Sequence, residues 1–120
     1  MVALVVAVAT TFLAFGCEEP RGSIEGTAYM QDGTPGSDLV IRAVRPEYPG
    51  VLVRTDDGGR YHLTNIPTGD WDIEFFDEDG WQVGLETVHV TAGATLTLDF
   101  TIGEKPLPEG FVPARIEGAP

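Results

Sequence analysis

Positively charged side chains are scarce in this sequence. Its 120 residues include 7 Lys and Arg against 19 Asp and Glu, which gives a net charge of −12. Such an acidic chain would be repelled by the phosphates of nucleic acid, so we expect no nucleic-acid partner. The hydrophobic share of 42% is nevertheless large enough for an apolar core, and the length fits one folded domain.

Residues that bind metals or carry out catalysis are equally few. His62 and His89 are the only histidines, both fall on outward positions of expected strands, and neither HExxH nor CxxC spacing occurs. Asp70 and Asp72 have the spacing of a glycosidase carboxylate pair, and the acidic turns offer oxygen ligands for calcium. Both patterns are also what an exposed strand face and Asp-Gly turns require. We therefore expect no cofactor and no enzymatic activity.

The first 16 residues contain no charged side chain. As a helix this segment would span about 24 Å, at about 1.5 Å per residue, which is shorter than the ~30 Å hydrocarbon core of a membrane. Its length and its position at the N-terminus predict a secretory signal peptide over residues 1–16.

The single cysteine follows this segment directly. Residues 13–17, L-A-F-G-C, resemble the bacterial lipoprotein box. The resemblance implies that Cys17 becomes the first residue of the mature chain and carries acyl chains such as palmitate, with residues 17–21 as a tether. Two or more acyl chains anchor a protein stably in a membrane, whereas one does not. The alternative is a free thiol at the end of an uncleaved signal or anchor helix.

The same resemblance implies a location. Lipoproteins of this kind are exported and held in the bacterial cell envelope. An Asp directly after the lipidated cysteine commonly retains such proteins at the inner membrane of enteric bacteria. Because Glu18 occupies this position here, the outer membrane is favoured.

Residues 55–76 carry the clearest pattern of the remaining chain. Asp57-Gly58 lies between two alternating apolar runs, 51–55 and 60–64, which predicts a β-hairpin because primed turns need positive φ. A corner is expected over residues 65–69, a Pro- and Gly-containing stretch that breaks the strand. The strand that follows alternates apolar with acidic residues, namely Trp71, Ile73 and Phe75 against Asp70, Asp72 and Glu74.

Further strands are predicted on both sides of this stretch, over residues 22–30, 39–44, 81–90 and 95–102. In the first of them, the small residues Gly26 and Ala28 would let a neighbouring layer approach closely. In the segment 81–90, the apolar residues change parity, so we expect a bulge near Glu86 and Thr87.

About seven short strands with no amphipathic helix between them predict an all-β fold. We expect an antiparallel Greek-key β-sandwich over residues 22–103, preceded by the signal peptide. Residues 104–120 are rich in Pro and Gly and are predicted to form a flexible tail, with Phe111 and Val112 as a weak docking spot.

The stretch G-R-Y-H-L-T-N-I-P-T-G-D-W-D-I-E-F resembles the carboxypeptidase regulatory-like domain, a transthyretin-like β-sandwich. The positions that match the family pattern are Asp56, Gly59, Tyr61, Leu63, Ile66, Pro67, Gly69, Trp71 and Ile73. The resemblance extends over residues 22–103 and implies an accessory domain without the peptidase. The residues expected to form the structural core are Tyr61, Leu63, Ile66, Pro67, Gly69, Trp71, Ile73, Phe75, Leu98 and Phe100.

These features predict a non-enzymatic, lipid-anchored β-sandwich module of the bacterial cell envelope, with a structural or protein-binding role. Its partners would be the membrane, through the lipid, and an envelope protein or a glycan. One alternative is a carbohydrate-binding module, which would need an exposed, coplanar aromatic pair such as Phe76 and Trp81; Trp81 is otherwise expected to pack at the end of the sandwich. The other is a small hydrolase, which would need an enclosed pocket joining a nucleophile to a base.

Overall fold

The computed structural model describes residues 20–116, and within this range the chain forms eight β-strands. The strands are β1 (Arg21–Tyr29), β2 (Val40–Arg45), β3 (Tyr48–Arg54), β4 (Arg60–Pro67), β5 (Gly69–Phe76), β6 (Gln82–Val90), β7 (Thr95–Thr97) and β8 (Phe100–Thr101). One sheet has the order β3-β2-β5-β6. In the other, β1 lies between β4 and β7, and β8 also pairs with β1.

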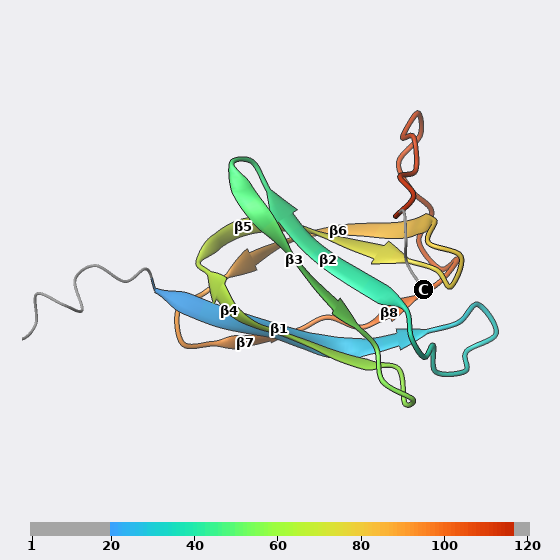
Figure 1. Cartoon of the computed structure of the whole chain (residues 1–120), viewed down its shortest axis with the longest axis horizontal. Helices are drawn as coiled ribbons and strands as arrows, with labels where there is room; N and C mark the ends of the chain where they lie inside the picture. Colours follow the sequence, from blue (N-terminus) through green and yellow to red (C-terminus); the bar gives the residue numbers. More distant parts are fainter. Residues whose placement is uncertain (1–19, 117–120) are drawn as a thin grey trace, which may run out of the picture.

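The two sheets face each other (Figure 1). The side chains between them form an apolar interior. Within the first sheet, β2 and β3 are antiparallel neighbours, and so are β5 and β6. After β4 has crossed to the other sheet, β5 returns to lie antiparallel beside β2, which is the Greek-key placement of a fourth strand beside the first. The predicted all-β sandwich is thus confirmed, with eight strands in place of about seven.

The predicted hairpin between residues 51–55 and 60–64 is wrong in its pairing. The turn itself is present, since the Asp56 N–H donates to the Arg60 carbonyl at 2.9 Å and Gly59 adopts a φ of 80°. Beyond the turn, β3 pairs with β2 and β4 pairs with β1, so the two strands enter different sheets. Each strand buries its apolar side chains against the opposite layer, and a local turn signal carries no information on whether its strands stay paired.

The predicted corner over residues 65–69 is present, and it carries the chain from β4 in one sheet to β5 in the other. Asn65 adopts a φ of 56° and Gly69 a φ of 125°. Pro67 is fully buried, and its carbonyl accepts a hydrogen bond from Trp71 Nε1 at 2.8 Å. The corner is therefore held by the first inward-facing aromatic residue of β5.

β6 contains a bulge, but not where it was predicted, and Leu85 keeps the parity opposite to that of Val88 because it pairs with the outward-facing Glu74. The register with β5 changes at Val83 rather than near Glu86 and Thr87. The packing of Phe100 accounts for this position, because a Cβ added at Gly84 would lie 2.3 Å from the Phe100 ring. The bulge lies where β6 must leave room for the ring, a contact that strand parity alone does not reveal.

The last predicted strand is split into β7 and β8, and both pair with β1 in parallel. Between them, the Leu98 N–H donates to the Glu25 carbonyl at 2.8 Å. Gly26 permits this close approach, because a Cβ there would lie 1.9 Å from the Leu98 carbonyl oxygen. The close approach expected at Gly26 therefore occurs, but with a neighbouring segment of the same sheet.

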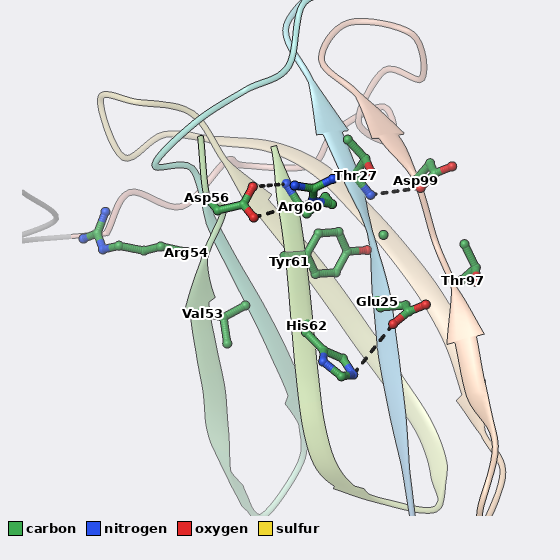
Figure 2. Close-up of a pocket in the computed structure, with 11 residues that line it drawn as sticks. Glu25, Thr27, Val53, Arg54, Asp56, Arg60, Tyr61, His62, Thr97 and Asp99 are labelled. Carbon is green, nitrogen blue, oxygen red and sulfur yellow. Dashed lines mark hydrogen bonds and ion pairs between the residues drawn. The ribbon is translucent and has the colours of Figure 1, made fainter. Parts of the chain in front are cut away.

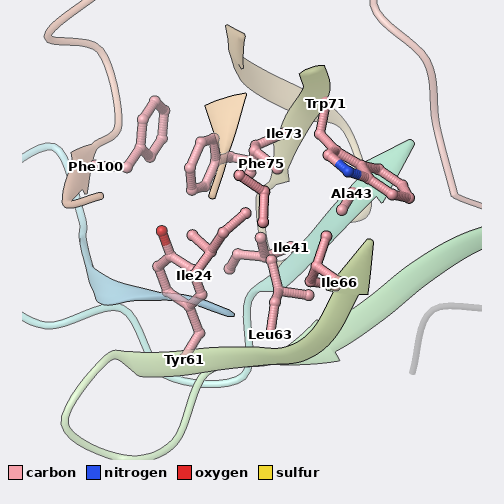
Figure 3. Close-up of a cluster of buried hydrophobic side chains, with 11 residues drawn as sticks. Ile24, Ile41, Ala43, Tyr61, Leu63, Ile66, Trp71, Ile73, Phe75 and Phe100 are labelled. Atoms are coloured by element: carbon pink, nitrogen blue, oxygen red, sulfur yellow. The ribbon is translucent and has the colours of Figure 1, made fainter. Parts of the chain in front are cut away.

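The core lies between the two sheets (Figure 3). The Phe75 ring stacks on Phe100 at a centroid distance of 4.1 Å and meets Tyr61 edge-on at 6.2 Å. The residues expected in the core that are buried are Tyr61, Leu63, Ile66, Pro67, Trp71, Ile73, Phe75 and Phe100. Leu98 is half-buried against this cluster, and Gly69 is half-buried at the corner.

The segment predicted as a flexible tail lies against the start of β6 up to Ile116. The Gln82 N–H donates to the Ala114 carbonyl at 2.9 Å, and the Ile116 N–H donates to the Gly80 carbonyl at 2.8 Å. These two bonds form a short antiparallel bridge. In the part of the chain that the structure describes, β1 begins at one end of the sandwich and this bridge lies at the other (Figure 1).

Candidate functional site

A broad, open hollow lies over the sheet that contains β1 and over the end of β3 (Figure 2). Its volume is about 540 Å³. The lining residues come from β1, β3, β4, β7 and the adjoining turns, and those with charged or ionisable side chains include Glu25, Arg54, Arg60, His62 and Asp99. Because β1 and β7 are far apart in the sequence, only the fold brings these side chains together.

Asp56 builds one side of the hollow through its turn. Its Oδ1 atom accepts hydrogen bonds from the N–H groups of Gly58 and Arg60, both at 2.9 Å. The bond from the Arg60 N–H is the main reason why the pKa of Asp56 lies below its usual value. Asp77 repeats the arrangement at the turn before β6, with bonds from Asp79 and Trp81 at 2.9 Å. Both acidic turns therefore use a carboxylate to stabilise the turn itself.

The charged groups of the hollow form loose, exposed pairs. His62 Nε2 lies 3.8 Å from Glu25 Oε1, and Arg60 Nε lies 3.6 Å from Asp56 Oδ2. All four side chains are more than half exposed. Pairs of this kind are screened by solvent and contribute between zero and about 1 kcal/mol. They do not form the enclosed acid–base pair that a hydrolase would need.

Tyr61 is the one buried ionisable residue of the hollow. Its hydroxyl donates to the Leu98 carbonyl. Burial raises the pKa of Tyr61 far above its usual value, and the nearby charges of Asp99 and Glu86 raise it further. The hydroxyl thus stays protonated at neutral pH and serves as a structural donor, because it cannot act as a base in that state.

The second histidine lies on the other sheet. His89 Nδ1 is 2.8 Å from Asp70 Oδ1, and Thr87 Oγ1 donates to Asp72 Oδ1 at 2.9 Å. Both contacts are exposed, so Asp70 and Asp72 are not joined in a cleft. Between residues 20 and 116, no three His, Cys, Asp or Glu side chains gather in a way that would hold a metal ion.

The two aromatic residues considered for carbohydrate binding have different environments. Phe76 is buried, with the Arg42 guanidinium 5.2 Å from its ring centroid. Trp81 is 49% exposed, and the Arg115 guanidinium lies 5.4 Å from its ring centroid. Of the large hydrophobic residues exposed within the described range, Trp81 alone is aromatic. The coplanar pair required for the carbohydrate-binding alternative is therefore not formed by these two residues.

Sequence reasoning identified His62 but not its surroundings. Glu25 and Thr27 lie beside β4 through the antiparallel pairing of β1 with β4, and Asp99 joins them through the parallel pairing of β1 with β7 and β8. The strand pattern predicted neither pairing. The sequence signal for this surface was the alternation of polar and apolar residues in the first and last strands. It indicates that one sheet face is exposed, but not which residues lie beside each other on that face.

The predicted lipid attachment site, Cys17, and the signal peptide lie outside the described residues. Between residues 20 and 116 the chain contains no helix of the length and hydrophobicity that crossing a membrane requires.

Comparison with known proteins identifies the fold through solved structures. No protein-family model matches the sequence. No curated protein matches it either. The solved structures that resemble it include the TIE protein of Bacillus anthracis, with 19% identity and a TM-score of 0.59 over 70% of this chain and 16% of that one.

Two further structures have the same fold. GBS52, the minor pilin of the Gram-positive pathogen Streptococcus agalactiae, is 18% identical, with a TM-score of 0.56 over 81% of this chain and 49% of its own. A protein from Pseudomonas aeruginosa for which carbohydrate binding has been suggested is 15% identical, with a TM-score of 0.53 over 72% of this chain and 93% of its own. This chain spans less than half the length of the first two. At these identities, the similarity shows a β-sandwich fold shared with bacterial proteins.

Proposed function

We propose that this chain is a non-catalytic β-sandwich module of the bacterial cell envelope, exported by residues 1–16, anchored by lipid on Cys17, and structural or protein-binding in its role. The observation that carries the proposal is the distribution of polar side chains over residues 20–116. Apart from the buried Thr55 and Gln82, they lie on open sheet faces and in turns, whereas the space between the sheets is filled by apolar side chains. A hydrolase would need a nucleophile and a base in an enclosed pocket.

The position of β1 supports the anchored arrangement. β1 begins at Arg21, four residues after Cys17, so a fully extended tether would reach no further than about 14 Å. The end of the sandwich that carries the corner at Pro67 would then face the membrane, and the end that carries Trp81 would face away.

Metabolic labelling tests the anchor. Cells that express the full chain are grown with a clickable palmitate analogue, and the chain is purified from the membrane fraction. We expect label on the wild type and none on a Cys17→Ser variant, which should accumulate as a precursor. Label that persists in the variant would contradict lipidation at Cys17. Cross-linking in intact envelopes tests the partner-binding role, and cross-links only to the chain itself would argue against a separate protein partner.

Carbohydrate binding is a second candidate function because Trp81 is half exposed on a turn whose N–H groups donate to Asp77. A single indole face can stack on a sugar ring, although two aromatic residues bind more strongly. Polysaccharide pull-down with wild type and Trp81→Ala tests this candidate. Leu52→Ala is the matched control, because Leu52 and Trp81 are both 49% exposed. Binding that is lost with Trp81→Ala and kept with Leu52→Ala would support it.

A further inference from the structure

The edge of β4 that faces away from β1 pairs with no other described strand. Among the described residues, β4 pairs only with β1, and β3, which precedes it in the chain, pairs only with β2. Two strands joined by a tight turn therefore leave their outer edges open beside each other, and the hollow of about 540 Å³ is lined by residues of both. An unpaired strand edge is a template for another strand.

The hydrogen-bond phase of β4 identifies which backbone groups are free. The Ala28 N–H donates to the Gly59 carbonyl at 2.8 Å, so Gly59 points toward β1. In an antiparallel strand, the backbone N–H and C=O groups of successive residues point to opposite sides. Those of Tyr61 and Leu63 therefore also point toward β1, whereas those of His62 point away from it. Arg60 agrees with this phase, because both its N–H and its carbonyl are bonded to Asp56 across the turn.

Thr64 follows His62 on the same outward phase, before a bulge at the end of the pairing with β1. His62 and Thr64 together direct two N–H groups and two carbonyls toward the open edge. Within the described part of the chain, β4 pairs with no strand on that side. Both side chains are exposed, and no Pro interrupts β4 before Pro67. This spacing is the one that an added strand pairs with.

The other edges are less available. Pro49 and Gly50 interrupt β3, β7 has only three residues, and the segment at Ala114 pairs with the start of β6. Natural sheets protect their edges with such features. On β4 such features, a bulge and Pro67, lie only at its end, and the hollow of about 540 Å³ lies beside the residues that precede them.

The charges around this edge indicate the chemistry of the strand that would bind there. The whole chain has a net charge of −12, so a second copy would be repelled. Arg54 and Arg60 already pair with Asp38 and Asp56. Glu25 lies on β1, across β4 from this edge, and its ion-pair partner is the exposed His62, while Asp99 accepts the Thr27 N–H. The net charge of the chain therefore favours basic side chains on an added strand.

We propose that the edge of β4, through the backbone groups of His62 and Thr64, binds an extended basic segment of a partner protein as an additional β-strand. The inference rests on the protein-binding role proposed above and names the surface for it. Alternate residues of the bound segment would lie beside Val53 on the inner side and beside His62 on the outer side. The inner positions would therefore favour apolar residues and the outer positions Lys or Arg.

Amide hydrogen exchange on the isotope-labelled full chain in neutral detergent micelles tests this surface directly. The probe is the capped heptapeptide T-K-V-K-V-K-T, and its counterpart has Glu in place of each Lys. In the free chain, we expect slow exchange at Tyr61 and Leu63 and fast exchange at His62 and Thr64. The basic peptide should slow exchange at His62 and Thr64 at least about tenfold, as a new hydrogen bond requires.

A proline substitution separates backbone pairing from side-chain contact. His62→Pro removes an N–H that makes no bond to β1, and should weaken binding of the basic peptide about tenfold. His62→Val also loses the imidazole but keeps the N–H, and should bind within about twofold of wild type, given that exposed contacts contribute little. If His62→Pro fails to fold, the exchange measurement on wild type still decides the question.

Several results would overturn the proposal. The basic peptide could fail to bind at millimolar concentration, or it could protect amides other than those of His62 and Thr64. The acidic peptide could also bind as tightly as the basic one. Concentration-dependent protection of the same amides without peptide would instead assign the edge to a second copy. If envelope cross-linking finds a partner but the basic peptide does not slow exchange along β4, the proposed function stands and only this surface is refuted.

Discussion

Replacing Gly26 with Ala tests the close approach between β1 and the segment that joins β7 to β8. A Cβ at this position would lie 1.9 Å from the Leu98 carbonyl oxygen and 2.6 Å from its carbonyl carbon, and real Cβ contacts are not shorter than 3.0 Å. The oxygen must therefore move by 3.0 − 1.9 = 1.1 Å or more. Because both atoms belong to backbone, no side-chain rotation relieves the clash.

The displacement removes two hydrogen bonds that converge on Leu98. These are the bond from its N–H to the Glu25 carbonyl and the bond from the Tyr61 hydroxyl to its carbonyl. Each is worth about 1 kcal/mol net. Overpacking adds about 1–3 kcal/mol, and the lower chain entropy of Ala in the unfolded state offsets about 0.5–1 kcal/mol. We expect Gly26→Ala to lower the free energy of unfolding by about 2–4 kcal/mol.

Urea unfolding followed by tryptophan fluorescence measures this change, because Trp71 is buried in the core. Gly58→Ala is the control: a Cβ there would meet its neighbours at ordinary distances of 3.4 Å or more. The control should stay within about 0.5 kcal/mol of wild type. If Gly26→Ala is as stable as Gly58→Ala, the close pairing of β1 with the Leu98 segment is wrong.

Three further predictions concern stability. Glu47 adopts a φ of 64°, a backbone conformation that costs a residue with a side chain about 1–2 kcal/mol. Glu47→Gly should therefore raise the urea midpoint, and an unchanged or lower midpoint would contradict strain at this turn. Phe75→Ala should lower the free energy of unfolding by about 3–5 kcal/mol in the same assay, since it empties the site between the Tyr61 and Phe100 rings; a loss below 1 kcal/mol would exclude this packing. Because the pKa of Tyr61 is raised in the folded chain, the unfolded chain loses the hydroxyl proton at a lower pH, near the ordinary pKa of 10.0. The free energy of unfolding should therefore fall as pH rises above that value. Tyr61→Phe should reduce the fall, and an identical pH profile in both proteins would refute the assignment.

The interior of the sandwich was predictable because it depends on local alternation. Trp71, Ile73 and Phe75 recur with a period of two, and a strand with that period buries one face whatever its neighbours are. The corner at Pro67 was predictable for a similar reason, since Pro and Gly restrict or widen the accessible backbone angles independently of tertiary contacts.

The open edge and the hollow were not predictable in this way. They depend on the separation of β3 and β4 into different sheets, whereas the Asp-Gly signal between them predicts a paired hairpin. Only two features of the candidate surface, the polar side chains of His62 and Thr64, could be read from alternation. Their free backbone groups follow from which strand β4 pairs with on its other side.

The sequence by itself thus determined the class of fold, the inward and outward faces of most strands, and the position of the turns, because each depends on residues within about ten positions of one another. The tertiary structure alone decided which strands pair, where β6 bulges around Phe100, and that β7 and β8 lie parallel to β1. The physical reason is that backbone hydrogen bonds are the same for every residue, so strand partners are chosen by side-chain packing across the whole core.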